Sequence, residues 1–190
     1  MKPNETADRI RRELAALRLD NVYTVSMPDD WTVAVNRKGC TDSTVLIRGG
    51  RVYEYMWLMR CESVAGDVTV EDMPGFLRYL VVILRPGPYA ACAGGLRFVN
   101  PAELRLFLQY TLPDKYEVAG GPDDPYATIT EPGVGFLRIA LNDNGRPYKV
   151  KPDGRHVGIQ GDQGVDLLEA VRRTMRNHTA GWQPVTDSRL

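Results

Sequence analysis

The side chains best suited to chemistry in this sequence are its two histidines. His156 follows a turn at residues 152–154, and a small hydrolase or transferase could use it as a general base if Asp153 or Asp162 oriented the ring. The alternative is an imidazole without a catalytic partner. His178 is expected near the end of a helix, where the helix dipole favours a protonated ring. Neither histidine lies in a metal-binding or nucleophile motif, so we predict no catalytic residue.

Two acidic turns could bind a divalent cation. Asp29-Asp30 and Asp123-Asp124 each follow a proline, and hard cations prefer several oxygen ligands. The spacing of a calcium-binding loop is missing, however, and aspartates in such turns commonly accept hydrogen bonds from backbone amides. The glycines form no phosphate loop either, because Gly94-Gly95 precedes an extended segment. We therefore predict neither a metal site nor a cofactor.

An aromatic strand offers the clearest candidate for binding. Over residues 51–60 the period of two places Tyr53, Tyr55 and Trp57 on one face. The opposite face is also largely apolar, which is typical of a central strand covered on both sides. The same pattern would suit an aromatic face that contacts a peptide, a helix or a nucleic-acid base. These three residues are our first candidate binding group.

The last helix supplies a second candidate group. It is expected to begin near Asp162, with apolar side chains at helical spacing on one face. Its other face carries Arg172, Arg173 and Arg176. A solvated helix face explains this pattern, and contact with a phosphate or an acidic partner is the alternative.

Composition narrows the class of protein. The 190 residues contain 24 basic and 24 acidic side chains, and this balance argues against a general nucleic-acid or membrane-surface binder. The longest apolar run, at residues 80–84, is far shorter than the ~20 residues that span a bilayer. The first five residues are polar, so we expect no signal peptide.

The cysteines and arginines indicate where such a protein would be found. Cys40, Cys61 and Cys92 are odd in number and lack the spacing of a metal site. We therefore expect reduced thiols and a cytoplasmic protein. Arginine strongly outnumbers lysine, and alanine, glycine and valine are abundant. This bias suggests a GC-rich bacterial genome, such as that of an actinobacterium, or its phage.

Hydrophobic spacing and turn residues define the elements that would position these groups. Helices are expected at 6–18, from Thr69 or Asp72 to 84, after Asn100-Pro101, and from about 162. Gly49-Gly50 and Asn144-Gly145 predict hairpins. Extended segments are expected at 22–27, 31–36, 44–48 and 51–60, and then near 116 and at 126–130, 135–141, 147–151 and 156–159.

The order of helix, extended segments and helix occurs twice. A shift of 94 or 95 residues aligns Asp20 with Asp114, and Gly50 with Gly145. Turns alone favour glycine and aspartate, which is the convergent explanation, but the order, the spacing and several other residues also agree. We predict an α+β fold of two tandem helix–antiparallel sheet–helix units related by internal duplication. The units are residues 1–95 and 96–190, packed as one compact body.

One resemblance supports a binding role. The strand at 31–36, the hairpin at 44–60 with its ending Met59-Arg60-Cys61, and the amphipathic helix at 70–84 resemble the small α+β domains of YbjN-type and type III secretion chaperone-like proteins. The resemblance covers about half of the chain, contains no diagnostic motif and transfers no functional residue. It implies a non-catalytic protein that binds another protein.

The prediction is therefore a non-enzymatic binding or adaptor protein with a protein partner and no membrane association. Two alternatives stay open. One is a nucleic-acid-binding module that stacks bases on Tyr53, Tyr55 and Trp57. The other is a small hydrolase or transferase around His156.

Overall fold

The first half of the chain forms one helix, a five-stranded antiparallel sheet and a second helix. The computed structural model describes residues 2–84, 96–151, 153–158, 167, 169 and 171–173. Sheet A has the order β1-β2-β3-β4-β5, each strand pairing with the next in sequence. Its elements are α1 (Pro3–Ala16), β1 (Tyr23–Ser26), β2 (Thr32–Arg37), β3 (Ser43–Arg48), β4 (Arg51–Met56), β5 (Cys61–Thr69) and α2 (Met73–Ile83).

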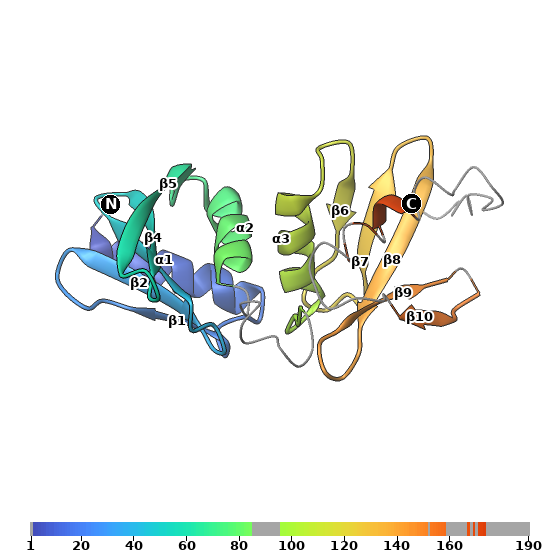
Figure 1. Ribbon diagram of the computed structural model, residues 1–190, viewed down its shortest axis with the longest axis horizontal. Coiled ribbons are helices and arrows are strands. Elements are labelled where there is room, and N and C mark those ends of the chain that lie inside the picture. Colours follow the sequence, from blue (N-terminus) through green and yellow to red (C-terminus); the bar gives the residue numbers. More distant parts are fainter. Residues whose placement is uncertain are drawn as a thin grey trace.

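The second half repeats this order. Sheet B has the order β10-β9-β8-β7-β6 and is again antiparallel, and residues 167, 169 and 171–173 are helical. Figure 1 shows the two sheets at opposite ends of the molecule, with one helix from each half between them. The predicted α+β fold of tandem units is confirmed. Its elements are α3 (Pro101–Thr111), β6 (Glu117–Ala119), β7 (Ala127–Glu131), β8 (Gly135–Leu141), β9 (Pro147–Val150) and β10 (His156–Gly158).

The first half has five strands where four extended segments were predicted. In the first half β4 ends at Met56 and the chain turns through Trp57–Arg60 into β5, so residues 51–60 are not one strand. Arg60 takes a left-handed conformation (φ 52°), which helps to reverse the chain. Of the two predicted starts for α2, Thr69 belongs to β5, and Asp72 is the N-cap because its carboxylate accepts a hydrogen bond from the Gly75 amide (3.1 Å).

The acidic turns have the role expected of aspartates in turns. The carboxylate of Asp29 accepts a hydrogen bond from the Trp31 amide (2.8 Å), and that of Asp124 accepts one from the Gly121 amide. No group of three potential metal-binding side chains occurs among the described residues. In this part of the chain the paired aspartates therefore stabilise turns between strands.

The hairpin glycine Gly145 also holds a long-range contact. Its φ of 74° is left-handed, and its carbonyl accepts a hydrogen bond from the Phe98 amide (2.9 Å). A Cβ atom at this position would lie 2.3 Å from the Phe98 carbonyl oxygen. Glycine is therefore required both by the turn and by the segment that packs over it.

Strand register separates a core face of sheet A from an outer face. Val35 pairs with Val45, and Ile47 pairs with Val52. All four are buried, and they belong to the hydrophobic core together with residues of α1 and α2. Because neighbouring residues of a strand point to opposite faces, the residues between them lie on the face away from the helices.

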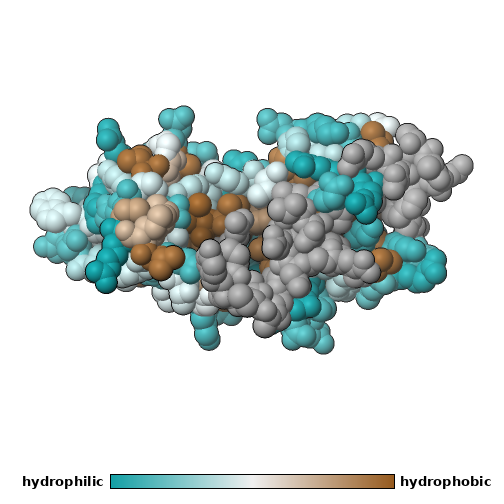
Figure 2. Space-filling model, in the orientation of Figure 1, coloured by the Kyte–Doolittle hydropathy of each residue, from teal (hydrophilic) through white to brown (hydrophobic). Residues whose placement is uncertain are grey.

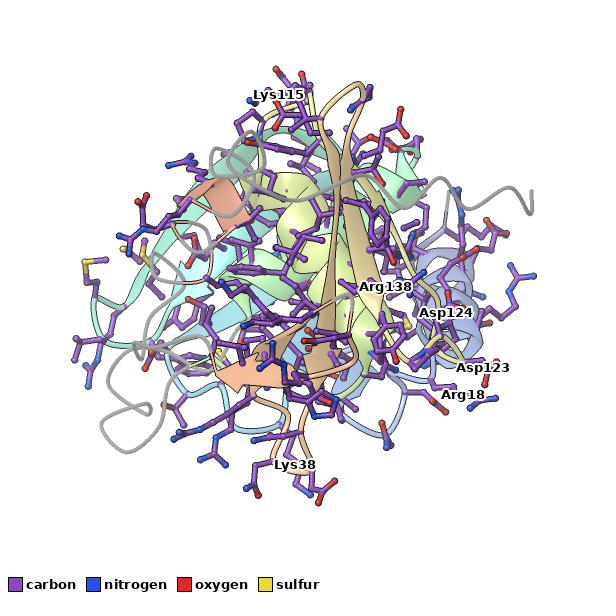
Figure 3. All side chains as sticks on the ribbon, turned by 90° about the vertical axis from the view of Figure 1, so that its right-hand side faces the viewer. Arg18, Lys38, Lys115, Asp123, Asp124 and Arg138 are labelled. Atoms are coloured by element: carbon purple, nitrogen blue, oxygen red, sulfur yellow. The ribbon has the colours of Figure 1, made fainter. Side chains whose placement is uncertain are left out.

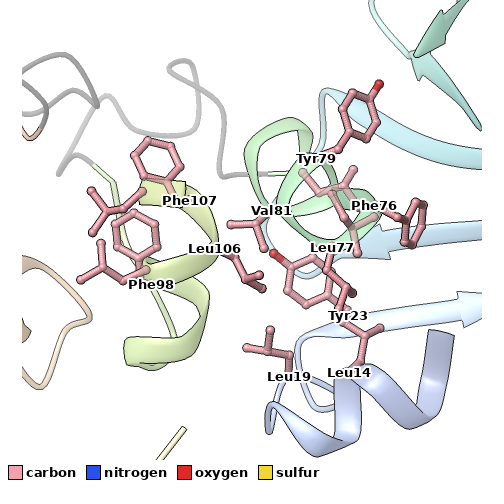
Figure 4. Close-up of a cluster of buried hydrophobic side chains, with 14 of the residues drawn as sticks. Leu14, Leu19, Tyr23, Phe76, Leu77, Tyr79, Val81, Phe98, Leu106 and Phe107 are labelled. Carbon is pink, nitrogen blue, oxygen red and sulfur yellow. The ribbon is translucent and has the colours of Figure 1, made fainter. Parts of the chain in front are cut away.

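The two halves meet where α2 packs on α3. Val81 and Leu77 of α2 lie beside Leu106 of α3 in Figure 4, and all three are buried. Under the 94-residue shift Leu106 corresponds to Arg12 of α1, which is exposed. At this position the side chain is thus apolar and buried only in α3, the copy of the helix that needs a second apolar face to pack on α2.

A buried polar cluster reinforces this junction. The Glu103 carboxylate of α3 accepts hydrogen bonds from the Arg37 Nε (2.8 Å) and Nη2 (3.2 Å) atoms and from the Tyr23 hydroxyl (2.7 Å). It also accepts one from the Val99 amide (2.7 Å). The Arg37 and Glu103 side chains are only 6% and 1% exposed. A carboxylate buried this deeply is tolerated because four donors surround it.

The protonation states in this cluster follow from burial and from the neighbouring charges. Burial, and then the Glu103 carboxylate, raise the pKa of Tyr23 well above its ordinary value. Burial lowers the pKa of Arg37, but the hydrogen bond and charge of Glu103 outweigh this effect and raise it overall. Tyr23 therefore remains a neutral donor, and Arg37 remains a cation.

Two further contacts join the halves near the cluster. The Asn100 side chain caps α3 by accepting a hydrogen bond from the Glu103 amide (3.0 Å), and it donates one to the Leu17 carbonyl (2.8 Å). Arg18 and Asp123 form an exposed ion pair (2.6 Å; Figure 3). The boundary predicted at residue 95 lies outside the described residues.

Candidate binding surface

Tyr53 and Tyr55 lie on the outer face of sheet A. In the β3–β4 register Tyr53 pairs with Leu46 and Tyr55 pairs with Thr44, whereas the buried core residue Val45 pairs with Glu54. The tyrosines therefore point away from α1 and α2, and both are half-buried. On β4 it is Val52, on the opposite face, that belongs to the hydrophobic core.

Trp57 joins this face from the turn after β4. Its indole Nε1 donates a hydrogen bond to the Thr44 hydroxyl (2.9 Å), and its backbone amide donates one to the Asp42 carbonyl (2.9 Å). The indole meets the Tyr55 ring edge to face, with 4.8 Å between the ring centroids. The structure thus brings Tyr55 and Trp57 into contact and fixes the indole, which is still 55% exposed.

The residues that follow Trp57 lie in a turn, whereas the sequence pattern predicted a strand up to residue 60. The alternation predicted along residues 51–60 would place Leu58 on the face opposite the tyrosines, but Leu58 is 88% exposed in the turn, and Met59 is 62% exposed. We call Trp57, Leu58 and Met59 the apolar turn. Figure 2 shows hydrophobic residues at the surface of the lobe that contains sheet A. The prediction failed because the alternation of residue types does not show where β4 ends.

Arg48 packs on one of these tyrosines, and its described interactions are within the chain. Its Nη1 atom lies 2.8 Å from the Glu62 carboxylate, and its guanidinium stacks over the Tyr53 ring at 5.9 Å. The hydrogen bond to Glu62 raises the pKa of Arg48. Of the two arginines on this aromatic face, Arg48 is therefore already paired to a carboxylate, and Arg51, its partner across β3 and β4, is exposed.

The arginines of the last helix lie far along the chain from this face. Leu167 and Val171 are buried, and Arg172 and Arg173 are exposed, as the helical pattern predicts. The Arg173 guanidinium is 3.7 Å from the Glu169 carboxylate. Arg176 lies outside the described residues. In the described part of this helix the pattern fits a solvated face.

Among the described residues, the recorded neighbour of His156 is an aromatic ring and not a carboxylate. His156 is exposed in β10, where its ring packs on Tyr148 with 4.5 Å between the ring centroids. The Asp153 carboxylate accepts hydrogen bonds from the amide and the side chain of Arg155 instead. Asp162 lies outside the described residues, as does His178.

A cavity of about 330 Å³ lies between β5, α2 and α3. The Asp72 carboxylate in it caps α2, the Gln109 amide donates to the Val118 carbonyl, and the Arg78 Nε donates to the Pro74 carbonyl. These polar groups are thus occupied by contacts within the chain. The cavity is lined by Asp67, Val68, Asp72, Gly75, Arg78, Gln109 and Tyr110.

The comparisons with known proteins identify no relative. No family model matches the chain, and neither a curated protein nor a solved structure is significantly similar to it. No helix in the described residues is long and apolar enough to cross a bilayer. The function must therefore be argued from the surface itself.

Proposed function

We propose that this chain is a non-enzymatic binding or adaptor protein, and that another protein contacts the apolar turn and the adjoining outer face of sheet A. The observation that carries the proposal is the exposure of three consecutive large apolar residues, Trp57, Leu58 and Met59, by 55%, 88% and 62%. Single exposed apolar residues are ordinary on protein surfaces, but a contiguous group is typical of an interaction site. Tryptophan and methionine are also enriched where proteins meet.

The preorganised indole supports this role. The Trp57 side chain is held by Thr44 and packs on Tyr55. An aromatic ring that is already ordered loses little conformational entropy when a partner covers it. Leu58 and Met59 extend the contact area around it without adding charge.

The charges near this surface favour a protein over a nucleic acid. Non-specific nucleic-acid binding depends on basic side chains that neutralise phosphates, whereas Arg48 is already paired with Glu62. The chain as a whole has no net charge. Free thiols at Cys40 and Cys61 agree with a reducing compartment, and we place the protein in the cytoplasm of a bacterium or of a phage-infected cell.

The proposal is tested by capture from a native lysate with matched variants of the full chain. Leu58→Asp changes the apolar turn, and Trp31→Asp changes a residue that is 76% exposed and lies beside the other end of the strands. Both positions are exposed, so each change is expected to alter stability by less than ~0.5 kcal/mol. We expect a protein that is retained by the wild type and by Trp31→Asp but not by Leu58→Asp, and that binds again after both proteins are purified.

Other outcomes would overturn the proposal. Capture that is equal for all three chains would show that the apolar turn is not the binding site. Recovery of no protein, together with turnover of a small molecule in a metabolite screen, would point to an enzyme. Binding to single-stranded DNA or RNA at about 50 mM salt that weakens strongly at about 200 mM would support the nucleic-acid alternative.

A further inference from the structure

The edge of sheet A formed by β5 differs from the other three sheet edges. β5 is nine residues long and pairs only with β4. Its first four residues, Cys61–Val64, are exposed and follow a regular antiparallel register from Met56 to Tyr53. In such a strand alternate residues direct their backbone N–H and C=O groups away from the sheet. Among the described residues, no backbone hydrogen bond from outside the sheet reaches this segment.

The other edges are short or capped by side chains. β1 has four residues, and its Val25 carbonyl accepts a hydrogen bond from Arg11 of α1 (2.9 Å). β6 has three residues, and its Val118 carbonyl accepts one from Gln109 of α3 (3.0 Å). β10 has three residues in the described part of the chain. Short or covered edges are a common protection against pairing with another chain.

The β5 edge lacks these forms of protection over its first four residues. Cys61–Val64 contains neither proline nor lysine, and its single charge, Glu62, is paired with Arg48. Val64 is 59% exposed on the outer face, where it pairs with Tyr53. The apolar turn leads directly into this edge. An unpaired backbone edge therefore adjoins exposed apolar side chains.

We propose that the edge of β5 at Cys61–Val64 binds an extended segment of the partner protein, which adds to sheet A as a sixth strand. Backbone hydrogen bonds to the open edge provide affinity in this mode of recognition, and side chains at alternate positions provide specificity. Apolar side chains of the segment would pack on Leu58 and Val64 over the outer face. This inference rests on the proposed function, because it assigns a binding mode to the same surface.

A second copy of this chain fits the edge less well than a different protein. An antiparallel pairing of two β5 strands centred on Cys61–Val64 would set Cys61 of one copy opposite Val64 of the other, and the apolar turn of each copy would lie at the end where the other copy continues toward Asp67. Leu58 and Asp67 are both exposed in the chain described here. Self-pairing would thus bring the apolar turn toward a carboxylate, whereas an apolar segment of another protein avoids this mismatch.

The experiment begins with a phage-displayed library of random peptides of roughly 12 residues, selected on the immobilised full chain. At ~3.3 Å per residue such a peptide is long enough to cover the edge and the apolar turn. An enriched peptide is synthesised and then N-methylated at one backbone position at a time. N-methylation removes a donor from the peptide and leaves the protein unchanged, so no variant of the chain needs to fold.

The effect of N-methylation on the affinity of the peptide is expected to alternate from one position to the next. Methylation at alternate positions should weaken binding at least ~10-fold, because each lost hydrogen bond also places a methyl group against the edge, and ~1.4 kcal/mol corresponds to tenfold. Methylation between them should change the affinity by less than about threefold. Leu58→Asp should weaken binding at least ~10-fold and Trp31→Asp by less than about twofold. Among residues 61–64, the alternate amides that point away from β4 should exchange hydrogen more slowly when the peptide is bound.

The outcomes separate this inference from the proposed function. If Leu58→Asp loses binding but the effect of N-methylation does not alternate along the peptide, strand addition is overturned and the proposed function is left in place. Equal binding by wild type and Leu58→Asp would contradict both, whereas a library from which no peptide is enriched would overturn strand addition alone. Dimerisation of the chain alone that Leu58→Asp abolishes would assign the edge to a second copy and overturn the inference.

Discussion

Replacing Glu103 by leucine tests how strongly the buried polar cluster joins the two halves. The change leaves Arg37 as a buried cation, and it also removes the acceptor for the Tyr23 hydroxyl and the Val99 amide. Removing one partner of a buried ion pair typically costs ~3–5 kcal/mol. Since small domains are stable by about 5–15 kcal/mol, we expect Glu103→Leu to remove a large part of the total stability.

The double variant Arg37→Met/Glu103→Leu should recover much of this loss. It removes both charges together, and buried ion pairs replaced by apolar residues often cost little. The coupling energy from the double-mutant cycle is therefore expected to be at least ~3 kcal/mol. Glu103→Gln, which keeps one carbonyl oxygen as an acceptor, should cost about 1.5–3 kcal/mol, the range for hydrogen bonds to charged groups.

Urea unfolding followed by circular dichroism gives these free energies. With a slope of about 2 kcal/mol per molar urea, a loss of ~4 kcal/mol moves the midpoint by about 2 M. The exposed ion pair between Asp8 and Arg11 is the matched control, and Asp8→Asn should cost less than ~0.5 kcal/mol. A coupling energy below about 1 kcal/mol would refute the reasoning, because it would mean that water solvates Arg37 when Glu103 is absent.

Three further predictions concern stability. Burial raises the pKa of Tyr79 to about 12 and that of Tyr23 well above its ordinary value. Both pKa values exceed the value near 10 of an unfolded tyrosine. The stability that these two neutral hydroxyls contribute should therefore be complete below about pH 10 and fall as the pH rises further. Unfolding curves of Tyr23→Phe should show a smaller alkaline loss, and an unchanged loss would contradict this assignment. Gly145→Ala should cost at least ~1 kcal/mol more than Gly133→Ala in thermal or urea unfolding, because both glycines have positive φ but only the first lacks room for a Cβ atom; equal costs would be inconsistent with the close approach. Asn100→Ala should lower the unfolding free energy by ~1–2 kcal/mol through loss of the cap, and a cost near zero would mean that water replaces it.

Much of the fold could be predicted because its signals are local. The caps at Asp72 and Asn100 and the hairpin glycines Gly50 and Gly145 act on backbone angles within a few residues. Hydrophobic spacing identified the helices in the same way. The internal repeat then followed from the order of these elements, and the structure shows that order twice.

The candidate site was only partly predictable for the same reason. Alternation along residues 51–60 correctly placed Tyr53 and Tyr55 together on one face, but it did not show that β4 ends at Met56. The length of a strand depends on the partner strand and on the turn that follows it. The alternation would therefore place Leu58 on the face opposite the tyrosines, although it is the most exposed of the large apolar residues described.

The sequence by itself determined the type and order of the elements, because propensity, capping and turn chemistry act between neighbours in the chain. Only the tertiary structure decided which surfaces are buried and which stay open. From its local pattern, Glu103 is an ordinary acidic residue in the first turn of a helix. In the folded chain it is buried at the junction of the halves, where it pairs with Arg37, 66 positions earlier. The local pattern of Cys61–Val64 gives no sign of an edge strand, but its place at the end of the sheet pairs it with β4 on one side only. Both outcomes depend on contacts between distant segments, which local patterns do not specify.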